Sequence, residues 1–204
     1  MKRPQILHLF AILTLFGLVG PTPDSALADS PKAAVQQLLQ SIKQVHHQKP
    51  LTPEQQHSND QASSQALSLM DVRQVSQKTL GKYWKERNQK EQEDFVQLLG
   101  GLFRYVAFPN SSKFFGEMHI DYADTQMEGT TATVPLTVQH PDEGAVGIDF
   151  VLEQNSARWR VVDVILDGVS MRNNLRTQFY KVIKKNDYAE LLRRMQKKLN
   201  DAKK

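Results

Sequence analysis

The spacing of apolar residues changes twice along this 204-residue chain, and these changes limit the folds that it can adopt. Up to Pro109 apolar residues recur at helical spacing, four segments between 118 and 166 alternate with a period of two, and helical spacing returns after Met171. Short connections between the four segments favour an antiparallel meander. We therefore expect a single α+β domain, in which N-terminal and C-terminal helices cover a four-stranded antiparallel sheet.

One face of the expected sheet is apolar and needs a cover. In the segments 131–139 and 146–154, apolar side chains alternate with Thr, Asp and Glu. The helices at both ends of the chain are the available cover, so we expect them to fold back on the sheet. Periodicity alone leaves two outcomes open, a closed core and a cavity lined by the same residues.

The segments before Pro109 differ in how clearly they predict a helix. Ser30-Pro31 has the residue types of a helix N-cap and first position, and Asn88 with Glu91 has the spacing of a capping box. We expect the apolar residues of 69–80 to share one helix face. The stretch 49–64 has two Pro and few apolar residues, which predicts a polar loop or insertion.

The N-terminus has the three parts of a secretory signal peptide over residues 1–28. A basic start is followed by an apolar run of about 15 residues, shorter than the roughly 20 needed for a span, and small residues precede Asp29. The remaining residues, 29–204, are enough for one domain. The chain has no Cys, which excludes disulfides and thiolate metal sites. We expect a periplasmic protein.

Charge is distributed unevenly along the sequence. From Arg172 to the C-terminus 11 Lys or Arg stand against three acids, a net charge of +8, whereas 29–171 has a net charge of −5. A basic end can meet nucleic acid, anionic lipid or an acidic protein, and export argues against nucleic acid. We expect docking of Arg172, Arg176 and Lys184 to an anionic membrane surface or an acidic partner, with a solvated helix face as the alternative.

Residues that could carry catalysis are few. Ser170 follows Gly168 as in a nucleophile elbow, but Arg172 occupies the second glycine position, so a helix N-cap is the favoured interpretation. Asp163 lies in an apolar strand, where backbone N–H groups could satisfy its carboxylate. The alternative is a catalytic base of a cone-shaped α+β isomerase. No His spacing typical of a metal site occurs, so we expect no metal, no cofactor and no enzyme activity.

Two long motifs stand out in the sequence. The first, from "LMDVRQ" to "LLGGLF", has an Asp near an apolar pair, Leu-Gly, a Trp and a Phe-rich helix. The second, "WRVVDVILDGVSMRNNLRTQF" with the Leu-rich helix after it, has an Asp within an apolar strand, Gly-Val-Ser and Arg-x-x-Phe. Together they resemble the MlaC, or toluene-tolerance, family of periplasmic phospholipid-binding proteins. The resemblance extends from Leu67 to Leu199, and the polar stretch 49–64 departs from it.

The resemblance implies a carrier that shuttles phospholipid between an inner-membrane ABC transporter complex with an MCE protein and an outer-membrane lipoprotein complex. A branch of the family associated with hopanoids leaves the lipid open, and an assembly protein that binds a partner by its apolar face is a further alternative. The resemblance also implies an apolar cavity between sheet and helices. We expect acyl chains to contact Phe95, Leu99, Phe103, Val134, Leu136, Val138, Ile148, Phe150, Leu152 and Val164, and ordinary core packing is the alternative for each.

Overall fold

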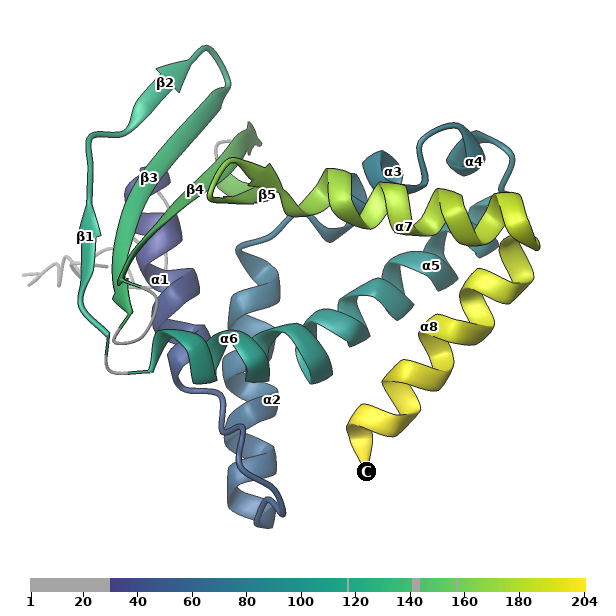
Figure 1. The fold of residues 1–204 in the computed structure, drawn as a ribbon, viewed down its shortest axis with the longest axis horizontal. Coiled ribbons are helices and arrows are strands. Elements are labelled where there is room, and N and C mark those ends of the chain that lie inside the picture. The colour runs from purple at the N-terminus through teal and green to yellow at the C-terminus, as the bar shows by residue number, and fades with distance from the viewer. Residues whose placement is uncertain (1–29, 117, 141–143, 157) are drawn as a thin grey trace, which may run out of the picture.

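The computed structural model describes residues 30–116, 118–140, 144–156 and 158–204. A twisted antiparallel sheet forms one end of the molecule, and helices extend from it (Figure 1). The α+β prediction is therefore confirmed. The predicted signal peptide, residues 1–28, lies outside the described residues.

The sheet contains the four predicted strands and two short ones. Its order is β1-β3-β4-β5-β6, with β2 also paired to β3. The predicted count of four was too low, because β2 and β6 are too short for alternation to reveal them. The strands are β1 (Ile120–Tyr122), β2 (Gln126–Glu128), β3 (Thr131–His140), β4 (Gly144–Asn155), β5 (Arg158–Leu166) and β6 (Val169–Ser170).

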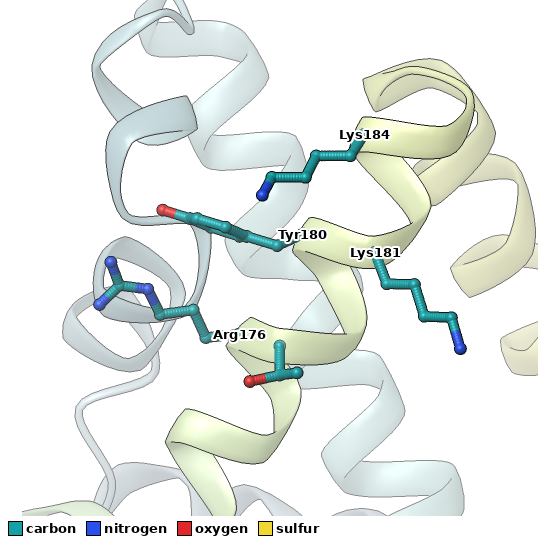
Figure 2. A pocket seen from close by; sticks show the side chains of 5 residues that line it. Arg176, Tyr180, Lys181 and Lys184 are labelled. Carbon is teal, nitrogen blue, oxygen red and sulfur yellow. The ribbon is translucent and has the colours of Figure 1, made fainter.

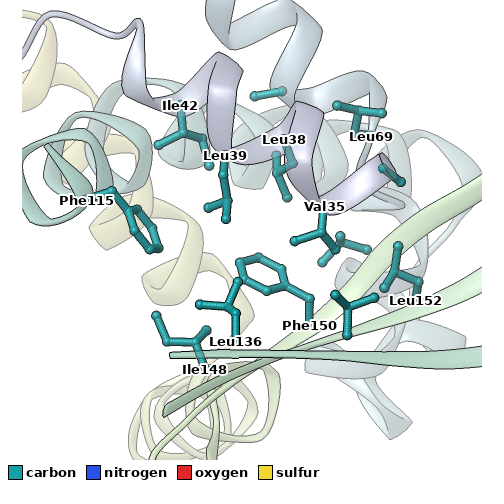
Figure 3. Close-up of a cluster of buried hydrophobic side chains, with 14 of the residues drawn as sticks. Val35, Leu38, Leu39, Ile42, Leu69, Phe115, Leu136, Ile148, Phe150 and Leu152 are labelled. Atoms are coloured by element: carbon teal, nitrogen blue, oxygen red, sulfur yellow. The ribbon is translucent and has the colours of Figure 1, made fainter. Parts of the chain in front are cut away.

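Helix α1 (Pro31–Lys43) covers the apolar face of the sheet (Figure 3). Ser30 caps it by accepting a hydrogen bond from the Ala33 N–H at 3.2 Å, as its sequence predicts. Its apolar stripe is 0–6% exposed and lies against the inward side chains of β3 and β4. We call this assembly the first core; it comprises buried residues of α1, α2, α6 and strands β3–β5, together with Val45 and Leu69.

The polar stretch 49–64 is largely helical, so the prediction of a loop was wrong. Helix α2 spans Pro53–Ser68, and Thr52 and Gln55 form a reciprocal capping box at its start. Its buried face consists of Ala62, Ser63 and Ala66. Small residues let α2 approach α1 closely but give almost no apolar periodicity, which is why the sequence pattern did not reveal the helix.

The segment that follows is divided between two regions of the molecule. Leu69 packs in the first core, and the chain then forms α3 (Val72–Leu80) and the single turn α4 (Lys82–Lys85). Asp71 caps α3 by accepting from the Gln74 N–H at 2.9 Å. Leu69 and Val75 therefore belong to different cores, and the prediction of one shared helix face was wrong.

One continuous rod connects the two regions. Helix α5 (Gln89–Leu102) begins with the predicted capping box and continues through the π-helical turn η2 (Phe103–Ala107) into α6 (Phe108–Phe115). The prediction that the helix ends at Pro109 was wrong. Proline has no N–H and its ring would clash with the carbonyl four residues earlier, and the wider turn, in which the Phe108 N–H donates to the Phe103 carbonyl, precedes it directly.

The C-terminal helices form a second core with α3–α5 rather than covering the sheet. Helix α7 (Met171–Lys185) follows β6 directly and runs away from the sheet, and α8 (Tyr188–Lys203) packs along α5 (Figure 1). The expectation that both fold back on the sheet was wrong. The second core comprises Val75, Leu80, Trp84, Phe95, Leu99, Phe179, Leu191 and Met195.

Candidate functional site

Six of the seven candidate residues on the sheet, those of β3 and β4, belong to the first core. Paired positions place Val134 opposite Phe150 and Leu136 opposite Ile148 in the antiparallel register. Leu136, Ile148 and Phe150 point toward α1 in Figure 3. With Val138 and Leu152 these side chains are 0–3% exposed, so in this structure they pack as a closed core against α1.

The helix candidates are divided between the two cores. Phe95 and Leu99 are buried in the second core, where the Phe95 ring meets Phe179 edge to face at a centroid distance of 5.8 Å. Phe103, in η2, is half-buried and packs against both cores. Its ring stacks on Phe108 of α6 at 6.3 Å. The ten candidates therefore do not face one common compartment, and Phe103 lies at the boundary.

Half-buried apolar side chains also flank the sheet end of the first core. Val164 pairs with Phe150, and Leu166 pairs with Ile148, so both extend the apolar face across β5. Each remains half-buried, as do Phe114 in α6 and Met118 after it. We call Phe103, Phe114, Met118, Val164 and Leu166 the boundary residues, because they pack against the first core without being enclosed by it.

The described surface includes two hollows, formed by α7 and by β2 with β3. One, of about 360 Å³, is formed along α7 by Arg176, Thr177, Tyr180, Lys181 and Lys184 (Figure 2). The other, of about 290 Å³, lies along β2 and β3. None of the ten candidate residues lines either hollow, so the apolar cavity between sheet and helices stays a prediction.

Asp163 is a structural carboxylate at the junction of the two cores. It is 6% exposed and accepts hydrogen bonds from the Val164 N–H at 2.8 Å, the Arg172 N–H at 3.0 Å and the Ser170 hydroxyl at 2.6 Å. The Arg172 guanidinium lies 3.6 Å away. These donors occupy the carboxylate and secure the start of α7 to β5, an arrangement that suits a fixed structural anion better than a catalytic base.

Ser170 is the N-cap of α7, as its sequence position predicts. Its hydroxyl oxygen accepts from the Asn173 N–H at 3.0 Å while its hydrogen is donated to Asp163. Three consecutive residues of β5, Val161, Val162 and Asp163, are buried, and the register between β4 and β5 shifts at the same place. The β5 backbone also exchanges hydrogen bonds with Leu69 and Asp71 through Val161.

The hollow on α7 contains Arg176 and Lys184, two of the three residues expected to dock to an anionic surface or an acidic partner, but the role of Tyr180 was not predicted. Tyr180 lies between Arg176 and Lys184 at spacings of four residues, which places all three on one helix face. Its hydroxyl accepts from the Lys82 N–H at 3.0 Å, and the Arg176 guanidinium lies 5.2 Å from its ring centroid. The spacing was visible in the sequence, but the contact with the turn at Gly81 joins segments about a hundred residues apart.

Neither a metal site nor a membrane-spanning helix is found within the described ranges. No group of three or more His, Cys, Asp or Glu side chains there is arranged to hold a metal ion. Across the same residues, no helix has both the length and the apolar character needed to cross a membrane. Both results concern residues 30–204 with their gaps at 117, 141–143 and 157.

Comparisons with known proteins give one family and one fold. Residues 32–197 match the family model described as MlaC protein. The fold is similar to a phospholipid-binding protein from Ralstonia solanacearum, whose structure contains a phospholipid, with a TM-score of 0.68 and 19% identity. The alignment covers 85% of this chain and 96% of that one. No curated protein matches the chain.

Proposed function

We propose that this chain, which belongs to the MlaC protein family, is a periplasmic carrier that shuttles phospholipid between an inner-membrane ABC transporter complex with an MCE protein and an outer-membrane lipoprotein complex. The match over residues 32–197 carries the proposal. The phospholipid in the Ralstonia solanacearum protein of similar fold supports it. Both comparisons point to a binding or transport protein rather than an enzyme.

The physical task of such a carrier is to keep acyl chains dry. A two-chain lipid that leaves a bilayer exposes about 30 methylene groups, each costing about 0.8 kcal/mol, so free diffusion through water faces a barrier above about 20 kcal/mol. A protein lowers this barrier by offering apolar surface of similar extent. Recognition of the chains needs no reactive group, in keeping with the structural role of Asp163.

We place the acyl chains at the boundary between the two cores. Phe103 packs against both, and Val164 extends the sheet face toward it while remaining half-buried. Among the described residues, none of the backbone hydrogen bonds between elements joins η2 to the sheet. Movement of η2 away from the sheet would open an apolar slot between them without breaking strand pairing or a helix. The fully buried Val134 and Leu152 would remain packed on α1.

The decisive experiment identifies what the purified protein contains. Native mass spectrometry of the chain expressed in a bacterial host, followed by lipid extraction, is expected to reveal bound phospholipid. A hopanoid in the extract would support the hopanoid-associated alternative. A ligand-free protein that also fails to take phospholipid from vesicles would overturn the carrier function.

A matched pair of variants tests the proposed location. Phe103→Glu places a charge at the boundary and is expected to abolish lipid retention. Met127→Glu places the same charge on β2, where the native side chain is 57% exposed, and is expected to retain lipid. Equal retention by both folded variants would remove the boundary from consideration as the acyl-chain site.

A further inference from the structure

Among the described residues, only Arg172 of the five cations on α7 pairs with an acidic side chain. On α5 Lys90 lies 2.6 Å from Asp94, and on α8 Glu190 holds Arg193 and Arg194 at 2.6 and 2.7 Å. Helix α7 contains no Asp or Glu. Among the described residues, Arg176, Lys181 and Lys184 have no acidic partner within 4 Å, and all three are exposed. We call these three the α7 basic face.

The structure also holds part of this face in place. The Lys82 N–H donates to the Tyr180 hydroxyl, and Arg176 stacks on the Tyr180 ring. Gly81 has φ +51°, and a Cβ built there would lie 2.3 Å from the Tyr180 hydroxyl oxygen, so a side chain at Gly81 would displace Tyr180. Arg176 and Lys184 are thereby presented on either side of a fixed ring at the 360 Å³ hollow (Figure 2).

The composition of the face favours a charged lipid surface over a protein partner. The cores of specific protein interfaces are depleted in charged residues and particularly in Lys, whereas three of the five residues that line the hollow are cations, two of them Lys, and none is a large aliphatic residue. The most exposed large apolar side chains, Met127 and Val169, lie on the strands β2 and β6. Arg, Lys and Tyr together are typical of membrane interfaces, where cations attract lipid phosphates and Tyr lies at headgroup level.

We propose that the α7 basic face docks the protein on an anionic phospholipid bilayer, with lipid phosphates at the hollow formed by Arg176, Tyr180 and Lys184. Arg172 has no part in this face, because it is committed to Asp163 and its side chain is 24% exposed. The inference rests on the proposed function, since it supplies the surface by which a carrier meets a membrane. It is tested separately from lipid binding.

The test compares two double charge reversals by vesicle flotation. K181E/K184E removes two cations from the face, and K197E/K198E makes the same change in net charge at two exposed lysines of α8 that have no described ion pair. Vesicles of phosphatidylcholine, with and without about 30% phosphatidylglycerol, provide anionic and neutral surfaces. All proteins carry the same N-terminal segment, so differences between them report the substituted helix.

We expect the unsubstituted protein to bind anionic vesicles, and its binding to weaken as salt rises from about 50 to about 500 mM. A cation near an anionic surface contributes about fivefold to binding, so K181E/K184E should bind at least about tenfold more weakly and K197E/K198E less than about threefold. Equal loss in both variants, or equal binding to neutral vesicles, would overturn the assignment. No vesicle binding would also overturn it and leave an acidic protein as the partner.

Native mass spectrometry of the same proteins separates this inference from the carrier function. K181E/K184E is expected to retain the lipid that the unsubstituted protein contains, because its substitutions lie away from the boundary residues. Reduced vesicle binding with full lipid retention supports the docking face. Absence of lipid from every protein, including the unsubstituted one, would instead contradict the carrier function.

Discussion

The first and second cores reach similar burial by different routes. The first core depends on strand pairing between β3, β4 and β5 and on α1, whereas the second is built by helices from two distant parts of the chain, α3–α5 and α7–α8. Each core contains one of the two Trp residues, Trp159 in the first and Trp84 in the second. The difference teaches that a basic C-terminal segment can complete a separate helical region instead of closing the sheet.

Three covalent connections join these cores: the segment from Leu69 into α3, the rod, and the β5–α7 junction. The rod α5–η2–α6 contributes Phe95 and Leu99 to the second core and Phe108 and Phe115 to the first. The β5–α7 junction is fixed by the hydrogen bonds to Asp163. We therefore expect the cores to unfold together although their buried side chains form distinct clusters.

Large-to-small substitutions should give the largest effects and test this coupling. Phe95→Ala and Phe150→Ala each leave a cavity in a fully packed site and should lower the free energy of unfolding by about 3–5 kcal/mol. Urea unfolding is followed by fluorescence in backgrounds carrying Trp84→Phe or Trp159→Phe, so that each core has its own reporter. Coupled cores predict that either substitution shifts both reporters equally.

Val169→Ala, at a side chain that is 53% exposed, provides the control and should change stability by less than about 0.5 kcal/mol. A substitution that shifts the reporter of its own core alone would show two independently unfolding units and would contradict the coupling.

Substitution of Asp163 should have the next largest effect, because it opens the junction. Asp163→Ala removes the acceptor for three hydrogen bonds and should cost about 2–4 kcal/mol. Ser170→Ala should cost about 1 kcal/mol as a lost N-cap. In a double-mutant cycle measured by urea unfolding the two effects should not add, because the side chains bond to each other. Additive effects, or an equal cost from Asp124→Ala at an exposed position, would contradict the junction role.

Substitution by Ala should affect stability differently at the two adjacent glycines of α5, Gly100 and Gly101. A Cβ at Gly100 would lie 3.9 Å from Val72, so Gly100→Ala should raise stability by up to about 1 kcal/mol through helix propensity. A Cβ at Gly101 would meet the Leu199 side chain at 3.0 Å, so Gly101→Ala should lose part or all of that gain by pushing α8 outward. Thermal unfolding compares the pair, and equal stabilisation would show that α8 packs more loosely here.

The ionisation of Tyr188, in the second core, should have the smallest effect on the free energy of unfolding. The effect should appear only at alkaline pH. Burial raises the pKa of Tyr188 to about 12, and the nearby Glu91 carboxylate adds to the shift. The unfolded phenol ionises near pH 10. The neutral folded form therefore contributes stability below about pH 10 that is lost as pH rises toward 12. Tyr188→Phe should make the stability curve flatter above pH 10 in urea unfolding, and parallel curves from pH 7 to 11 would contradict this contribution.

Local patterns in the sequence predicted most helices and strands, but they did not predict which elements pack against each other. Alternation placed Leu136, Ile148 and Phe150 on one sheet face, and capping chemistry placed the starts of α1 and α5. The destination of α7 was missed, because an amphipathic stripe does not specify which apolar surface it meets. Helix α2 was missed because close packing of Ala62 and Ala66 needs no strong periodicity.

The candidate site was predictable to a smaller extent. Ser170 as a cap and Asp163 as a satisfied carboxylate followed from their places between strand and helix, and the geometry agrees with both. Phe95 and Phe103 shared an expected lining role because they lie on one helical stripe. Whether that stripe faces one compartment or two depends on the π turn between Leu99 and Phe108, which no local residue pattern announced.

Because of the π turn, the number of residues between the two buried ends of the rod determines which way its side chains face. Leu99 and Phe108 are buried in different cores on either side of it. Deleting one residue from η2 would restore ordinary helical phase and rotate everything beyond it by about 100°. Phe108 and Phe115 would then turn away from α1 while Phe95 stayed in place. The rod therefore cannot lose a residue at η2 without exchanging the surface that it presents to α1.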